Sequence, residues 1–381
     1  MFTPLTRLLE DGLNGGIYTA AVALAGVGGE LRWQAAVGRL SRDPGARAAS
    51  PATVFDLASL TKPLATALAL LSLLDGGRLT PTATLGELLP GEAWLPPDKR
   101  PLSLGSLLAH RAGLPAWAPF YLEILQAPPA ARRGLLPRLA AAAPLLQPPD
   151  TATLYSDLGF MLLQAVVETV SGLTLDRFCA EKIYRPLGLE VLGFNPLPIP
   201  DHAGLTTENG RRQTADQVYA ATETGLIAGR RIFGEVHDEN AWAAGGVAGH
   251  AGLFGPGIEV FRLLAALYRA YRGEAGSLPF SPAAVRHFLT PVAQGGRTLG
   301  FDTPGLDASQ RAAGRYFSPA SVGHLGFTGV SFWLDLELGQ MVVLLTNRVH
   351  LGRDALAGIR AFRPRFHEAA SRALGFGRVR L

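Results

Sequence analysis

Segments typical of β-strands lie near both ends of the chain, and segments typical of helices lie between them. Residues 15–26 and 29–40 are apolar runs on either side of a glycine-rich turn, which favours a hairpin. Near the other end, three apolar runs separated by turns predict strands over 321–329, 330–337 and 340–347. This order predicts one sheet assembled from both ends of the chain.

The middle of the chain is rich in Leu, Ala and Pro, and its short helical patterns predict a mostly helical insertion. With 381 residues, 48% of them hydrophobic, the chain is long enough for two interleaved subdomains. We therefore expect an α/β (α+β) fold with an antiparallel sheet flanked by helices. Residues 1–77 and 317–381 would form the α/β subdomain and residues 78–316 the helical one, together making one domain with a cleft between the two parts.

Charge and composition disfavour several classes of protein. The formal net charge is only +4 and no dense run of Lys or Arg occurs, which argues against nucleic-acid binding. The first residues lack the pattern of a signal peptide, so we expect a cytoplasmic protein, or a periplasmic or secreted one if a leader was removed. The longest apolar stretch, 64–74, is too short to span a bilayer. The single cysteine, Cys179, excludes an internal disulfide.

Ser59 and Lys62 stand three residues apart at the start of the apolar segment 59–74. On a helix, residues with this spacing share a face, and Pro63 fits only near the first turn of a helix. A serine needs a neighbouring base to act as a nucleophile, and a lysine supplies one if burial lowers its pKa. The apolar surroundings predict such a lowered pKa for Lys62. The alternative is that Ser59 only caps a helix while Lys62 points to water.

Tyr155, Ser156 and Asp157 directly precede a second long helical pattern. In the structural interpretation, Ser156 or Asp157 is the N-cap of that helix and Tyr155 packs beside it. In the functional interpretation, the Tyr155 phenol lies beside Ser59 and Lys62 and relays protons to and from a substrate.

His324, Leu325 and Gly326 lie on a predicted strand near the end of the chain. A glycine at the edge of a strand lets a substrate backbone or acyl group come close. The alternative is that the glycines of this segment only form a hairpin turn.

The three motifs occur in the order S-x-x-K, Y-x-[N/D] and H-x-G. In this order the chain resembles the serine β-lactamase and penicillin-binding-protein-like superfamily, in particular the branch of serine hydrolases related to class C β-lactamases. Segments 104–115 and 234–254 are similar to further segments of that family. The resemblance covers nearly the whole chain and implies the β-lactamase-like fold.

The resemblance also implies a role for each matching residue. Ser59 matches the nucleophile that is acylated, Lys62 its base partner, and Tyr155 the tyrosine that relays protons. The backbone N–H groups of Ser59 and Phe327 match the oxyanion hole, where losing one donor costs roughly 2.7–4 kcal/mol. The resemblance implies substrate-binding positions at Asp157, His324, Leu325 and Gly326.

Three of these substrate-binding positions depart from the family pattern. Asp157 stands where the family usually has asparagine, and an ionised Asp accepts hydrogen bonds but donates none, so it would instead hold Lys62 charged. His324 replaces the lysine of K-T-G, and a mostly neutral histidine lacks the cation that holds a substrate carboxylate. Leu325 lacks the hydroxyl of that motif. These changes weaken recognition of a carboxylated β-lactam.

We therefore expect a serine hydrolase that acts through an acyl-enzyme on an ester or amide, either esterase-like or peptidase-like. A true β-lactamase, a D-amino-acid peptidase and a catalytically silent binding homologue are the alternatives. The expected partner is a small-molecule ester, amide or β-lactam, and the sequence leaves the oligomeric state open.

No cofactor and no metal are expected. The chain has no G-x-G-x-x-G fingerprint for a nucleotide and no G-x-S-x-G nucleophile elbow. His237, Asp238 and His250 suggest metal ligands, but no H-E-x-x-H pair or cysteine cluster accompanies them. The glycines between them indicate a tight loop instead. His110, in a different segment, is typical of a structural hydrogen-bonding residue at a helix end.

Overall fold

The computed structural model describes residues 2–197, 219–223, 232–274, 276, 279–292, 296–305 and 311–377. A five-stranded antiparallel sheet has the strand order β2-β1-β8-β7-β6. Its strands are β1 (Ala20–Val27), β2 (Glu30–Gly38), β6 (Ser321–Leu325), β7 (Ser331–Asp335) and β8 (Gln340–Thr346). Because β1 pairs with β8, with Val22 opposite Leu345, the first and last strands meet at the centre of the sheet. The predicted sheet from both ends of the chain is confirmed.

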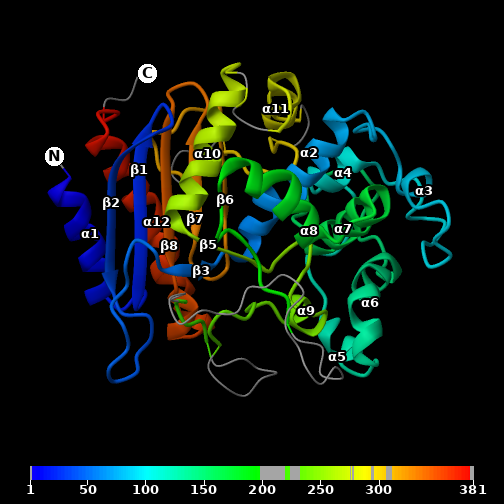
Figure 1. Cartoon of the computed structure of the whole chain (residues 1–381), viewed down its shortest axis with the longest axis horizontal. Coiled ribbons are helices and arrows are strands. Elements are labelled where there is room, and N and C mark those ends of the chain that lie inside the picture. The colour runs from blue at the N-terminus through cyan, green and yellow to red at the C-terminus, as the bar shows by residue number, and fades with distance from the viewer. Residues whose placement is uncertain are drawn as a thin grey trace.

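Helices cover both faces of this sheet (Figure 1). Helices α1 (Thr3–Asn14) and α12 (Leu356–Ala373) lie on one face, and α10 (Gly257–Tyr271) lies on the other. Strand β1 is buried on both sides: Ala21 and Ala23 belong to the hydrophobic cluster under α1 and α12, while Val22 and Leu24 belong to the main core. This alternation with period two explains why β1 is an almost continuous apolar run.

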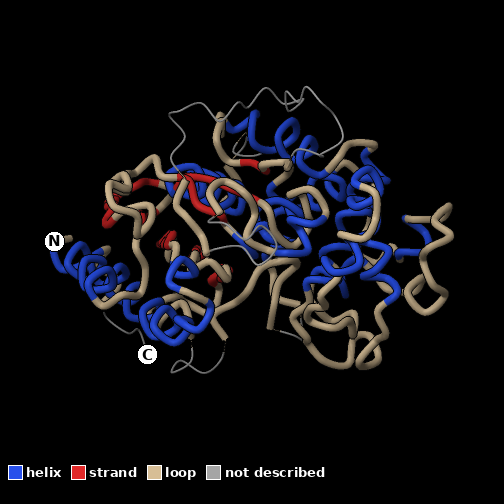
Figure 2. Tube along the Cα trace, turned by 90° about the horizontal axis from the view of Figure 1, so that it is seen from below, coloured by secondary structure: helices blue, strands red, loops and turns tan. Residues whose placement is uncertain are grey.

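The remaining helices gather beside the sheet, on the side away from the two chain ends, in both views (Figures 1 and 2). They are α2 (Leu68–Asp75), α3 (Leu85–Leu88), α4 (Leu104–Leu108), α5 (Tyr121–Ile124), α6 (Pro129–Ala142), α7 (Asp157–Ser171), α8 (Leu175–Cys179), α9 (Glu239–Ala243) and α11 (Pro282–Leu289). A second, three-stranded sheet has the order β3 (Val54–Asp56), β5 (Leu253–Pro256) and β4 (Gly193–Phe194). The mixed α/β fold is as predicted, whereas the subdomain boundaries at 77 and 317 stay a prediction.

One helical stretch of the described residues, Ala58–Asp75, is long and apolar enough to cross a membrane by length and composition. Helix α7 (Asp157–Ser171) and the helical stretch Leu175–Leu187, which begins with α8, are bent by 70° at a break and pass the same test only as a pair. However, 78% of Ala58–Asp75 is buried inside the protein, which is the pattern of a core helix.

Candidate active site

The segment that carries Ser59 is not a plain α-helix. Strand β3 leads into a 3-10 turn, Ala58–Leu60, followed by a π-helical segment, Lys62–Ala67, before α2 begins. Ala58 has a φ of +46°, in the left-handed region that L-residues rarely adopt, and its N–H donates to Asp56 Oδ1 at 2.8 Å. Such local strain is often found at functional sites. The helix expected from Ser59 onwards is present as one helical stretch, Ala58–Asp75, but its first turns are 3-10 and π-helical.

The three predicted catalytic side chains lie together. Lys62 Nζ donates to Ser59 Oγ at 3.1 Å. The Tyr155 side chain lies beside them: Lys62 Nζ is 4.9 Å from the centre of its ring, and both Lys62 and Ser59 act to lower the pKa of its phenol. Lys62 is fully buried, and its Nζ also donates to the carbonyl of His250 at 3.2 Å. The alternative in which Lys62 points to water is excluded.

Asp157 sets the charge of Lys62. Asp157 Oδ1 lies 2.6 Å from Lys62 Nζ. Burial lowers the pKa of Lys62, but the charges and hydrogen bonds of Asp157 and Tyr155 together outweigh it and raise that pKa above its ordinary value. The expectation that apolar surroundings make Lys62 a neutral base is therefore wrong, and the expectation that Asp157 holds Lys62 charged is confirmed.

His110 and Ser156 fix the position of Tyr155. The Ser156 N–H donates to His110 Nδ1 at 3.0 Å, and the His110 ring lies 4.5 Å from the Tyr155 ring. Ser156 caps α7 by accepting from the Gly159 N–H. Burial lowers the pKa of His110 well below its usual range, so the imidazole is neutral and Nδ1 can accept. The prediction that His110 is a structural hydrogen-bonding residue is confirmed.

Burial raises the pKa of Tyr155, which is therefore a neutral phenol.

The turn that follows β6 packs directly against the Ser59 segment. Thr328 Oγ1 donates to the carbonyl of Asp56 at 2.8 Å. A Cβ at Gly326 would lie 3.0 Å from the carbonyl oxygen of Leu57 and 2.4 Å from Val330 Cγ2. Only glycine allows this close approach, which packs the turn against Leu57 and Ala58, directly before Ser59 in the chain.

The side chains of His324 and Leu325 point to opposite faces of β6. The His324 ring lies 6.0 Å from the Tyr155 ring. Leu325 instead packs against the hydrophobic cluster under α1 and α12. Its side chain therefore lies away from the site, contrary to the expectation of a substrate-binding position. Burial lowers the pKa of His324 to about 4, which agrees with the prediction of a neutral histidine.

This pKa predicts an acid-sensitive fold. The unfolded chain takes up a proton at this histidine near pH 6.5, the folded protein only near pH 4, so the unfolded state binds more protons between these values. As pH falls through this window, the free energy of unfolding should decrease by about 1–3 kcal/mol because of His324. Urea unfolding measured at pH 7.5 and at pH 4.5 checks this. Between these two pH values, His324→Gln should lose less free energy of unfolding than wild type. The exposed control His287→Gln should behave as wild type, and an equal loss in both variants would contradict the assignment.

A second cation lies near Tyr155. Arg297 Cζ lies 5.4 Å from the centre of the Tyr155 ring, and the guanidinium is paired with Asp302. Asp302 pairs with Gly323 of β6 through two backbone hydrogen bonds of 2.8 and 2.9 Å, which carries Arg297 to the site. No motif marks Arg297, so only the fold could reveal it.

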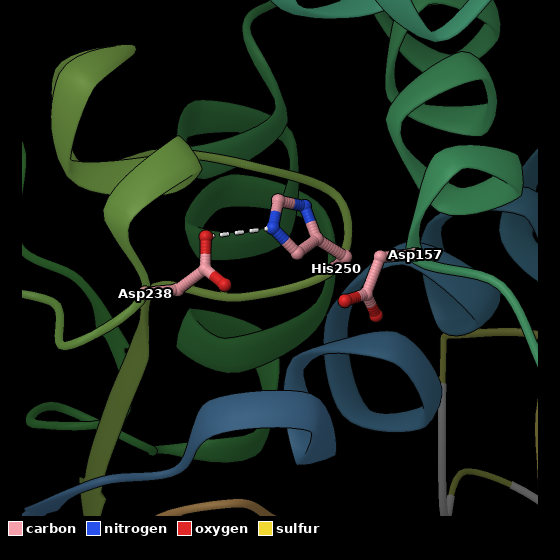
Figure 3. Close-up of side chains that lie close together, drawn as sticks. All are labelled: Asp157, Asp238 and His250. Carbon is pink, nitrogen blue, oxygen red and sulfur yellow. Dashed lines mark hydrogen bonds and ion pairs between the residues drawn. The ribbon is translucent and has the colours of Figure 1, made fainter. Parts of the chain in front are cut away.

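Asp157, Asp238 and His250 also come close together at the site (Figure 3). One potential ligand atom of each lies within 4.8 Å of the others. Each of them already has a partner in the protein, because Lys62 pairs with Asp157 and His250 Nε2 lies 2.9 Å from Asp238 Oδ1. His237, the other residue considered as a ligand, hydrogen-bonds Glu223 instead. The absence of a metal stays a prediction.

A family model described as Beta-lactamase matches residues 5–362. The chain belongs to the β-lactamase family. A protein of Escherichia coli (strain K12) named "Putative D-alanyl-D-alanine carboxypeptidase" is 34% identical over 314 residues, covering 79% of this chain and 70% of that protein. A protein of the same name from Salmonella typhimurium is 30% identical, covering 78% and 70% of the two chains. The resemblance predicted from the three motifs is confirmed, and the β-lactamase-family protein is a serine hydrolase.

Solved structures support the fold of this β-lactamase-family chain. The octameric penicillin-binding protein homologue from Pyrococcus abyssi superimposes with a TM-score of 0.69 at 19% identity, covering 98% of this chain and 77% of that one. EstCE1, described as a hydrolase with promiscuous acyltransferase activity, gives 0.65 at 22% identity, with 94% and 97% covered. At these identities the likeness shows the fold alone.

Proposed function

We propose that the protein cleaves an ester or amide by a two-step mechanism through an acyl-enzyme on Ser59. Ser59 Oγ forms a bond to the substrate carbonyl carbon, the bond to the leaving oxygen or nitrogen breaks, and water then hydrolyses the acyl-enzyme. The observation that supports this most directly is the 3.1 Å hydrogen bond from Lys62 Nζ to Ser59 Oγ, with the Tyr155 ring centre 4.9 Å from the same Nζ.

Because Lys62 is charged at rest, it accepts the Ser59 proton only if it passes one of its own to another group. Asp157, 2.6 Å away, is the acceptor in this proposal. The neutral Tyr155 phenol protonates the leaving group and regains a proton from Lys62, which recovers its own from Asp157. In sum, Ser59 loses one proton and the leaving group gains one. Lys62, Tyr155 and Asp157 all return to their resting protonation states.

The N–H groups of Ser59 and Phe327 complete the proposed site as the oxyanion hole. Within the part of the chain that the structure describes, the Phe327 N–H has no protein acceptor. A free N–H in the turn that packs against the Ser59 segment is available to a developing oxyanion.

A fluorophosphonate probe tests this proposal. The native protein should be labelled once, with the adduct on the peptide that contains Ser59, and Ser59→Ala should remain unlabelled. Hydrolysis of a p-nitrophenyl ester provides the second measurement. Equal rates for native protein and Ser59→Ala would instead favour the catalytically silent binding protein.

A peptidase acting on peptides that end in a D-amino acid with a free carboxylate is the second candidate. Arg297 favours it, because this half-buried guanidinium supplies beside Tyr155 the cation that His324 lacks. The names of the E. coli and Salmonella relatives point in the same direction. A chromogenic cephalosporin separates both candidates from a true β-lactamase.

Arg297→Gln distinguishes the two candidates. If Arg297 holds a substrate carboxylate, kcat/KM for a D-alanyl peptide should fall by about 10- to 100-fold, the value of a hydrogen bond to a charged group. Hydrolysis of a neutral p-nitrophenyl ester should change little. The exposed control Arg262→Gln should change neither rate. An equal fall for both substrates would mean that Arg297 only supports Tyr155.

A further inference from the structure

Two buried arginines hold the turn between β6 and β7, residues 326–330. Arg363 Nη2 donates to the carbonyl oxygens of Gly326 at 2.7 Å and Val330 at 2.8 Å. Arg348 donates to the carbonyl oxygen of Phe327 through Nε at 3.0 Å and through Nη2 at 2.7 Å. Three carbonyls of this one turn therefore accept hydrogen bonds from guanidinium groups.

Arg363 comes from α12, on the face of the sheet opposite α10 (Figure 1). Its side chain is almost completely buried, at 5% exposure. Among the described residues, no carboxylate pairs with it, and its Nε has no hydrogen-bond partner. Burial, followed by the nearby Arg348 and Arg360, lowers the pKa of Arg363 to about 9, so it is still charged at pH 7. A buried cation without a counter-ion is costly, which calls for a role beyond stability.

One of the two carbonyls that Arg363 binds, that of Gly326, belongs to the same peptide group as the Phe327 N–H. This peptide bond is trans, so its C=O and N–H point in opposite directions. A guanidinium fixed on the Gly326 oxygen therefore fixes the direction of the N–H on the other side of the peptide plane. A charged donor on the oxygen also polarises the peptide group and strengthens the N–H as a donor.

We propose that Arg363 is a positioning residue for the oxyanion hole: from α12 it orients and polarises the Gly326–Phe327 peptide so that the Phe327 N–H stabilises the negative charge that develops during acyl transfer. This inference rests on the proposed acyl-enzyme mechanism. Arg348 holds the next carbonyl in the turn, and its Cζ lies 4.6 Å from the centre of the Phe327 ring. The two arginines thus fix the peptide groups on both sides of the Phe327 Cα.

Infrared spectroscopy of the acyl-enzyme tests the role directly. Hydrogen bonds from an oxyanion hole lower the stretching frequency of the acyl carbonyl, which a ¹³C=O-labelled arylacryloyl ester makes visible after rapid mixing. In Arg363→Met this frequency should rise. The value of kcat/KM should fall by about 10- to 100-fold, with little change in KM. This fall is smaller than the roughly 100- to 1,000-fold cost of losing a donor outright. Arg363→Lys, which keeps the charge, should lie between Arg363→Met and wild type.

Two controls on the same helix separate this role from stability. Arg365→Met removes an exposed arginine and should change nothing, while Phe362→Leu should lower the melting temperature without moving the carbonyl frequency. A wild-type carbonyl frequency in both Arg363 variants, whatever their melting temperatures, would overturn the inference. If Arg363→Met does not fold, a wild-type frequency in Arg363→Lys alone would overturn it. If the wild-type protein forms no acyl-enzyme, the proposed mechanism fails first and this inference fails with it.

Discussion

Lys62→Met is expected to reduce kcat/KM for ester hydrolysis by about 10³- to 10⁴-fold, the range of a lost proton-transfer group in a unit of interacting catalytic residues. The amine is the only group that contacts the Ser59 hydroxyl, the Tyr155 phenol and the Asp157 carboxylate together among the described residues. Its removal leaves the Ser59 proton without a path. Steady-state hydrolysis of a p-nitrophenyl ester measures the effect.

Two further lysine variants show whether the proton or only the charge matters. Lys62→Arg keeps a cation but cannot release a proton at neutral pH, so it should be nearly as inactive as Lys62→Met. Lys99→Met removes the other fully buried lysine, which pairs with Asp98, and should retain activity in whatever protein remains folded. An active Lys62→Arg variant would show that Lys62 acts through its charge alone.

The fold could be predicted from the sequence because its main elements have simple periodicity. Strands β1 and β8 are nearly continuous apolar runs, and the glycines between β1 and β2 mark a tight turn. The elements around Ser59 could not be predicted in the same way. Their form depends on the positive φ of Ala58 and on contacts with the β6–β7 turn more than 250 residues later, which no local pattern contains.

The site could be predicted only in part. The residues Ser59, Lys62 and Tyr155 follow from motif order, but the charge of Lys62 depends on the 2.6 Å contact with Asp157, which spacing does not give. Arg297 and Arg363 are indistinguishable in sequence from the other arginines that supply most of the 35 basic residues. They are distinguished by what they contact, the Tyr155 ring and the buried Gly326 carbonyl.

Asp157 stands where the family usually has asparagine, and in the proposed mechanism it decides which base is available at neutral pH. With Asp157 present, Lys62 is charged at rest and the carboxylate is the end point of the proposed proton path. With asparagine in its place, burial would dominate and the pKa of Lys62 would fall below its ordinary value. The neutral amine would then be the base itself, but only at a pH high enough to deprotonate it.

Asp157→Asn should therefore change the pH dependence of kcat/KM as well as the rate. At pH 6 to 7 we expect a fall of about 100-fold, because the variant has neither a carboxylate acceptor nor a neutral lysine. The rate should then rise about tenfold per pH unit towards the lowered pKa of Lys62, whereas wild type shows no such rise. Asp176→Asn, which removes a largely buried carboxylate paired with Arg133, should keep the wild-type profile. A variant at Asp157 with wild-type rate and profile would rule out the carboxylate as proton acceptor and leave Tyr155 as the base that activates Ser59.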